Sequence, residues 1–214
     1  MSIMTLILGE SGTGKSTSLR NMGHGGKCLL IRSRKKRLPF PSPEWEEFST
    51  ETEKGNIFTT DSAETVVKII RNTKRKIIVL DDFQYVMANE FMRRSSESGF
   101  TKFTEIGRHA WDVISEASEK DDETRIYFMW HPDTDNTGKV KAKTIGKMLE
   151  EKITVEGMFL ICLRTHVEDG VYSFMTQSGG NDPAKSPMGM FDFKIPNDLE
   201  EVDKRICEYY SIER

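Results

Sequence analysis

The sequence predicts an α/β fold in which a mostly parallel central sheet carries helices on both faces. Over residues 1–131, short apolar runs alternate with segments of helical periodicity, a pattern typical of parallel strands joined by crossover helices. A glycine-rich loop directly follows the first apolar run, where a strand would turn into a helix. The length of 214 residues fits one domain, which we expect to span residues 1–214.

The predicted strands are short apolar runs bounded by turn-forming or charged residues. Four of them are expected to lie in the parallel part of the sheet, at residues 2–8, 28–31, 77–80 and 125–130. Two later runs, 159–163 and 171–175, are separated by a turn at 168–170 and predict an antiparallel hairpin. We expect this C-terminal hairpin to extend the sheet.

The predicted helices carry apolar residues at helical spacing or helix-capping signals. They are expected at residues 17–22, at 61–70 (with Asp61 to Glu64 as a capping box), at 102–118, at 145–152 and at about 199–209. Residues 83–100 fit a helix followed by a loop. Polar and glycine-rich stretches predict loops at 133–143 and 177–189.

Composition excludes several classes of protein. The formal net charge is −3, which excludes a globally basic nucleic-acid-binding protein but leaves room for a local basic patch. Cys28, Cys162 and Cys207 lie far apart without a C-x-x-C pair, which indicates reduced thiols and neither a disulfide frame nor a zinc site. No apolar stretch approaches the ~20 residues of a membrane span, and no signal peptide is evident. We therefore expect a cytoplasmic protein.

The segment GESGTGKS at residues 9–16 matches G-x-x-x-x-G-K-[ST], the phosphate-binding loop of nucleoside triphosphatases. Glycines allow the backbone N–H groups to surround a phosphate, and the following helix N-terminus adds positive charge. Lys15 is expected to bind the β- and γ-phosphates, and Ser16 a Mg²⁺ ion. The predicted ligand is ATP with Mg²⁺, bound by Gly9, Glu10, Ser11, Gly12, Thr13, Gly14, Lys15, Ser16 and Thr17.

Two further strand ends carry candidate catalytic residues. The strand at 77–80 ends in two carboxylates, of which Asp81 is expected to hold the metal ion. Asp82 and Gln84 are candidates for orienting the attacking water, although Asp82 also fits a helix N-cap. His131 ends the next strand and is expected to sense the γ-phosphate, with a strand-capping role before Pro132 as the alternative.

These motifs follow one another in a distinctive order: GESGTGKST, VLDD, a long helix, a strand ending in MWHP, a hairpin and the loop NDPAKSPMGMF. In this order, over roughly residues 3–193, the sequence resembles the phage-encoded RecA-like ATP-binding proteins. Some members of that group act in single-strand annealing and recombination. The resemblance implies a RecA-like core of the P-loop NTPase fold, and a role in the host cytoplasm.

The resemblance also implies roles for individual residues. Asp81 matches the Walker B acid, and His131 matches the sensor position. Lys185 lies in a loop that often carries a basic residue reaching the nucleotide of the next subunit, which implies a homo-oligomer. The separate C-terminal domain of RecA and its usual catalytic glutamate are not evident, which leaves filament formation and the identity of the base open.

Three basic segments are candidates for binding single-stranded DNA, which favours basic grooves with aromatic stacking platforms. They are residues 32–37 with Phe40 and Trp45 nearby, residues 93–103, and residues 139–143. The resemblance favours the third segment, with Lys139, Lys141 and Lys143, because the loop after the sensor strand contacts DNA in RecA-like proteins. Taken singly, each segment also fits a solvated surface.

The predicted function is therefore Mg²⁺-dependent ATP hydrolysis, coupled to single-stranded DNA in phage recombination or replication. Two rivals are a P-loop kinase acting on a nucleoside or small molecule, and a nucleotide-gated adaptor or motor subunit with little turnover. Strand order separates the first rival from the prediction. One strand lies between the phosphate-loop strand and the Asp81 strand in the ATPase branch, whereas the two are adjacent in kinases.

Overall fold

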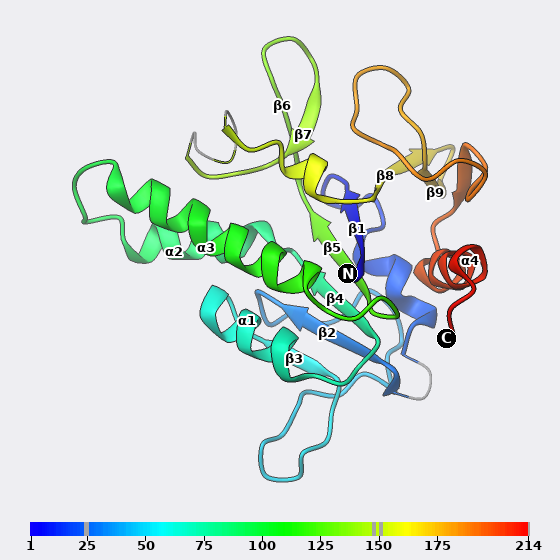
Figure 1. Cartoon of the computed structure of the whole chain (residues 1–214), viewed down its shortest axis with the longest axis horizontal. Helices are drawn as coiled ribbons and strands as arrows, with labels where there is room; N and C mark the ends of the chain where they lie inside the picture. Colours follow the sequence, from blue (N-terminus) through cyan, green and yellow to red (C-terminus); the bar gives the residue numbers. More distant parts are fainter. Residues whose placement is uncertain (24–25, 147–148, 150–151, 214) are drawn as a thin grey trace.

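A computed structural model describes residues 1–23, 26–146, 149 and 152–213. Eight strands form one sheet in the order β10-β9-β8-β1-β5-β4-β2-β3 (Figure 1). The six strands from β8 to β3 in this order are parallel, and β9 and β10 are antiparallel. The strands of this sheet are β1 (Ile3–Leu8), β2 (Cys28–Arg32), β3 (Ile57–Thr59), β4 (Ile77–Asp81), β5 (Arg125–Trp130), β8 (Ile161–Glu168), β9 (Val171–Met175) and β10 (Lys194–Pro196). The predicted mixed α/β fold with a mostly parallel sheet is confirmed.

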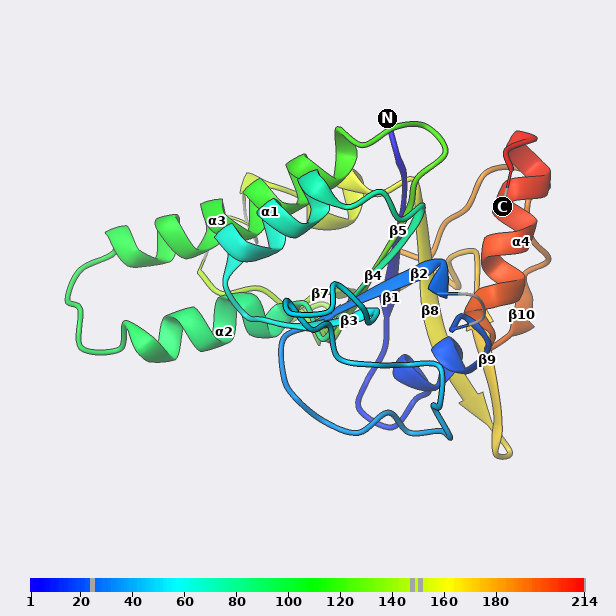
Figure 2. The ribbon, with the colours of Figure 1, turned by 90° about the horizontal axis from the view of Figure 1, so that it is seen from below.

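The sheet is covered on both faces because its central strands are apolar on both sides, as parallel strands usually are. Figure 2 shows three helices on one side of the sheet, namely α1 (Ala63–Asn72), α2 (Gln84–Arg93) and α3 (Thr101–Ser118). The other side carries α4 (Leu199–Tyr210) and a 3₁₀ helix at Ser16–Asn21. Alternate residues of β1 serve the two cores: Leu6 packs with the α1–α3 side, and Ile7 with the α4 side.

Local sequence accounts for where the main helices begin. The Ser62 side chain accepts a hydrogen bond from the Thr65 backbone N–H, so Ser62 caps α1 and the predicted Asp61 cap is wrong by one residue. Asp198 caps α4 in the same way through Glu200. In α3 the small and branched residues of one face are fully buried, at Ile106, Ala110, Val113, Ile114 and Ala117.

Several expectations need correction. The predicted loop 133–143 contains a small hairpin, β6 (Pro132–Thr134) paired with β7 (Val140–Ala142), which extends to the top of Figure 1. The edge strands β3 and β10 are too short, at three residues each, to show a strand pattern in the sequence. The helix predicted at 17–22 is a six-residue 3₁₀ helix. The helix predicted at 145–152 lies largely outside the described residues.

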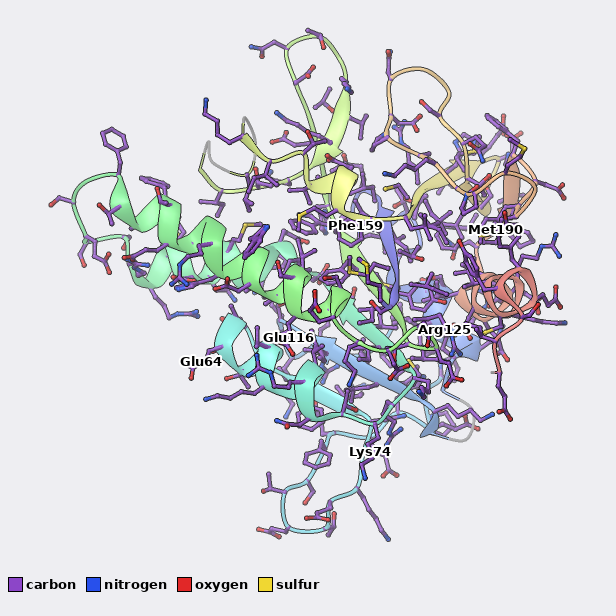
Figure 3. The ribbon with its side chains drawn as sticks, in the orientation of Figure 1. Glu64, Lys74, Glu116, Arg125, Phe159 and Met190 are labelled. Carbon is purple, nitrogen blue, oxygen red and sulfur yellow. The ribbon has the colours of Figure 1, made fainter. Side chains whose placement is uncertain are left out.

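A buried charge cluster lies at the amino end of the sheet, between β5 and α4. Arg125 donates two hydrogen bonds to Asp203, from Nε at 3.0 Å and from Nη2 at 3.1 Å, and both side chains are fully buried. The Tyr127 hydroxyl donates to the same carboxylate at 2.6 Å. Figure 3 labels Arg125 beside α4. This cluster ties the C-terminal helix to the centre of the sheet.

Candidate functional site

A pocket of about 710 Å³ opens at the carboxyl ends of β1, β2, β4 and β5. Open α/β sheets bind their ligands at this edge, because the loops that leave the parallel strands converge there. The lining brings together three sequence-distant segments: residues 11–17, residues 34–39 and the strand-end residues Asp82, Tyr85 and His131, with Tyr172 from β9.

The loop at residues 9–16 (the phosphate loop) needs glycine at two positions for different reasons. A Cβ at Gly9 would lie 2.0 Å from Thr165 Oγ1 and 2.7 Å from Thr13 Oγ1, so only glycine fits there. Gly14 has φ +97°, and a Cβ there would lie 2.9 Å from the Tyr172 ring. The two threonine hydroxyls are hydrogen-bonded to each other at 2.6 Å, which anchors the loop to β8. Close packing at both glycines thus fixes the path of the loop against β8 and β9.

Lys15 lies buried within its own loop. Its Nζ donates to the Gly9 carbonyl at 2.6 Å and to the Glu10 carbonyl at 3.0 Å. Burial lowers the pKa of Lys15, and the carboxylates of Asp82 and Asp81 counteract part of this effect. These neutral carbonyls satisfy the ammonium without neutralising its charge, so it remains available to an anion that enters the loop.

The side chains of Ser16 and Asp81 are hydrogen-bonded to each other beside the pocket. The Ser16 hydroxyl donates to the two Asp81 carboxylate oxygens at 3.1 and 3.0 Å. Burial raises the pKa of Asp81, and the adjacent Asp82 raises it further, against the opposing effects of Lys36 and Ser16. A hydroxyl and a carboxylate side by side are oxygen donors of the kind that Mg²⁺ takes together with phosphate oxygens and water. The residues present therefore fit the predicted metal ion.

Asp82 follows in a left-handed conformation, with φ 57°. Its carboxylate forms an ion pair with Lys36 and lies 3.5 Å from His131 Nε2. Burial by itself would raise the pKa of Asp82, but the hydrogen bonds from His131 and Lys36 outweigh burial and hold the pKa well below its usual range. The alternative that Asp82 is a helix N-cap is wrong, since α2 is preceded by Phe83 and has no side-chain cap.

The Gln84 side chain contacts the backbone of His131. The Gln84 Oε1 accepts a hydrogen bond from the His131 N–H at 3.3 Å, and the Gln84 side chain is buried. This contact fixes the end of β5 against the start of α2. Four of the five predicted catalytic residues, Lys15, Asp82, Gln84 and His131, thus gather at one edge of the sheet.

The basic run 32–37, a candidate for binding single-stranded DNA, contributes to this pocket, which was not predicted. Residues 34–37 (the basic loop: Arg34, Lys35, Lys36 and Arg37) all line the pocket opposite the phosphate loop. Arg34 lies over the Tyr85 ring, 5.2 Å from its centroid. The run directly follows β2, which pairs with β4, so its residues emerge at the same sheet edge as Asp81 and Asp82. No local stretch of sequence indicates this pairing.

The other predicted residues lie apart from the pocket. Lys185 forms backbone hydrogen bonds with Cys162 of β8, at 2.8 and 2.9 Å, and is absent from the pocket lining. Lys139 and Lys143 are exposed on the β6–β7 hairpin, and Lys141 is half-buried. The Lys143 N–H donates to the His131 carbonyl at 2.9 Å. The base of the hairpin is therefore hydrogen-bonded to the predicted sensor residue.

The basic segment 93–103 uses its charges within the protein. Arg94 contacts Glu90, Glu97 and Glu105, and Arg93 pairs with Asp61. The Lys102 ammonium donates to two backbone carbonyls of the α2–α3 connection. These partners leave this segment less suited to phosphate contacts than the β6–β7 hairpin.

No protein-family model matches the chain, and no curated protein matches it either. Within the described part of the chain, no helix is both long enough and apolar enough to cross a membrane.

Proposed function

We propose that this protein is a Mg²⁺-dependent P-loop ATPase with a RecA-like core that acts on single-stranded DNA in phage recombination or replication. The observation that carries the proposal is strand order combined with one contact. β5 lies between β1, which leads into the phosphate loop, and β4, which ends in Asp81. Ser16 of the loop is hydrogen-bonded to Asp81 across that intervening strand. The kinase rival expects β1 and β4 to be neighbours.

The proposed chemistry follows from the positions of the side chains. Backbone N–H groups of the phosphate loop and the Lys15 ammonium would hold the β- and γ-phosphates, while Ser16 and Asp81 would hold Mg²⁺. The metal ion, when bound, would neutralise charge on the phosphates. Asp82 and Gln84 lie at the same edge, where either side chain could orient a water molecule toward the terminal phosphate.

The DNA part of the proposal depends on the β6–β7 hairpin. Its lysines are the residues that would contact the DNA phosphates. The hydrogen bond between the hairpin and the His131 carbonyl could couple the bound nucleotide to DNA binding. The distance of Lys185 from the pocket of its own chain is compatible with the proposed role toward a neighbouring subunit. A homo-oligomer is therefore part of the proposal.

The first test is ATP hydrolysis by the purified protein at low salt, with and without single-stranded DNA, alongside Lys15→Ala. We expect turnover that DNA stimulates, and a fall of about 10²-fold or more in the variant, because the loop loses its cation. Replacing Lys139, Lys141 and Lys143 together by Ala should reduce the log–log salt slope of DNA binding by about 2. ATP binding without turnover would favour the adaptor rival, and turnover indifferent to DNA would remove the nucleic-acid part.

A further inference from the structure

One cation of the basic loop is placed differently from the rest. The Lys36 ammonium forms an ion pair with Asp82 and lies 3.7 Å from Asp81 Oδ2, so it contacts both carboxylates at once. Lys35, its neighbour, lines the same pocket but forms no ion pair with any residue that the structure describes. Lys36 is thus the member of this loop that reaches the pocket floor.

The Lys36 ammonium lies close to the place where the proposed metal ion would bind. Ser16 and Asp81 mark the proposed metal site, and Lys36 lies 3.7 Å from Asp81 Oδ2, an oxygen to which Ser16 also donates. Two adjacent carboxylates repel each other when both are ionised, and a cation between them relieves the repulsion. A divalent ion at Ser16 and Asp81 would take over this role and repel the ammonium.

A triphosphate would at the same time provide a new partner for Lys36. Lys15, Asp82 and His131 line the pocket together with Ser16. Because a lysine at this position of the loop reaches the β- and γ-phosphates, we place the terminal phosphate near these residues. The Lys36 side chain is 41% exposed on a surface loop, and its flexible stem can turn through a few ångströms without unfolding the sheet. A diphosphate would end before this point.

We propose that Lys36 binds the terminal phosphate from within the same chain. In the nucleotide-free site it holds Asp81 and Asp82, and with a triphosphate bound it moves to a terminal phosphate oxygen and leaves Asp82 to accept a hydrogen bond from water. This inference rests on the proposed function. According to this proposal, Lys36 makes the site bind a triphosphate more tightly than a diphosphate.

The test compares Lys36→Met with the matched control Lys35→Met, which removes the same charge one residue away. Dissociation constants for ATP and ADP with Mg²⁺ are measured by titration calorimetry. Lys36→Met should weaken ATP about 10-fold and leave ADP nearly unchanged, because a hydrogen bond to a charged group is lost. Lys35→Met should shift the two nucleotides equally. An unchanged ATP-to-ADP ratio in Lys36→Met would overturn the inference.

A second readout needs no nucleotide. Mn²⁺ alone, monitored by its electron paramagnetic resonance signal, should bind Lys36→Met more tightly than the wild type, because the competing ammonium is gone. Equal Mn²⁺ affinity in the two proteins counts against the inference. Lys15→Ala in the same calorimetry tests the underlying function: loss of both nucleotides supports it whatever Lys36 does, and unaltered binding in Lys15→Ala sinks the function itself.

Discussion

The two ends of the central sheet carry the same kinds of charged group but arrange them in opposite ways. β5 begins with Arg125, whose pairing with Asp203 is complete and fully buried. The same strand leads into His131 at its other end, where Asp81 and Asp82 share one ammonium, from Lys36, beside an open pocket. We call the amino-end cluster closed, because it is fully buried and paired within the protein. We call the carboxyl-end cluster unfinished, because it lies beside an open pocket.

The difference shows what makes a buried charge structural or functional. At the amino end, two Arg125 donors and the Tyr127 hydroxyl satisfy the Asp203 carboxylate inside the protein, so no outside group can improve the arrangement. At the carboxyl end, burial raises the pKa of Asp81, while hydrogen bonds from His131 and Lys36 hold that of Asp82 low. These two carboxylates lie beside an open pocket whose lining carries several cations, so a ligand that enters can replace one of their partners.

The largest expected effect tests the closed cluster. Asp203→Ala should lower the free energy of unfolding by about 3–5 kcal/mol, because it leaves the Arg125 charge buried without its partner. Urea denaturation followed by circular dichroism measures this change. Lys68→Ala, which breaks the exposed Lys68–Glu64 pair on α1, is the control and should change stability little. If Asp203→Ala changes the free energy of unfolding only slightly, the Arg125–Asp203 pair does not stabilise the amino end as proposed.

The next effect tests the unfinished cluster. Asp81→Asn should reduce ATP turnover by about 10²-fold or more, since the proposed metal site loses its carboxylate. Its free energy of unfolding at neutral pH should stay equal to that of the wild type or rise, because a carboxylate whose pKa is raised by burial disfavours the folded state when ionised. Turnover and urea denaturation are measured on the same preparation. A variant that unfolds would break the contrast between the two ends.

The smallest effect concerns the rigid part of the carboxyl end. Gly9→Ala places a Cβ against Thr165 Oγ1 and should destabilise the protein by about 1–3 kcal/mol through overpacking. Adding Thr165→Ala removes the nearest obstructing atom, Thr165 Oγ1, but leaves Thr13 Oγ1 at 2.7 Å, and should recover part of the loss. Thermal unfolding of the single and double variants measures both steps. If the double variant is no better than Gly9→Ala, contact with Thr165 is not the reason for glycine at this position.

Local patterns in the sequence were enough for most of the sheet. β5 was predicted to the residue, because a continuous apolar run between charged and proline-containing segments has one plausible structure. The β6–β7 hairpin was missed, because each of its strands has only three residues: β6 is mostly exposed, and the two buried residues of β7, Val140 and Ala142, are too few to mark a strand. The cap of α1 was misplaced by one residue, because Asp61 and Ser62 are both good capping residues and only geometry selects between them.

The sequence alone was sufficient to predict the longer strands, but not the three-residue ones, and to predict that Lys15, Ser16 and Asp81 would lie close together. Those properties follow from hydrophobic period and from the strand ends of a parallel sheet. It was not sufficient to place the basic loop. Residues 34–37 look the same whether they face solvent or a pocket, and Lys36 meets Asp81 and Asp82 because β2 pairs beside β4. Strand order is set by packing among distant segments, and no local stretch of sequence contains it.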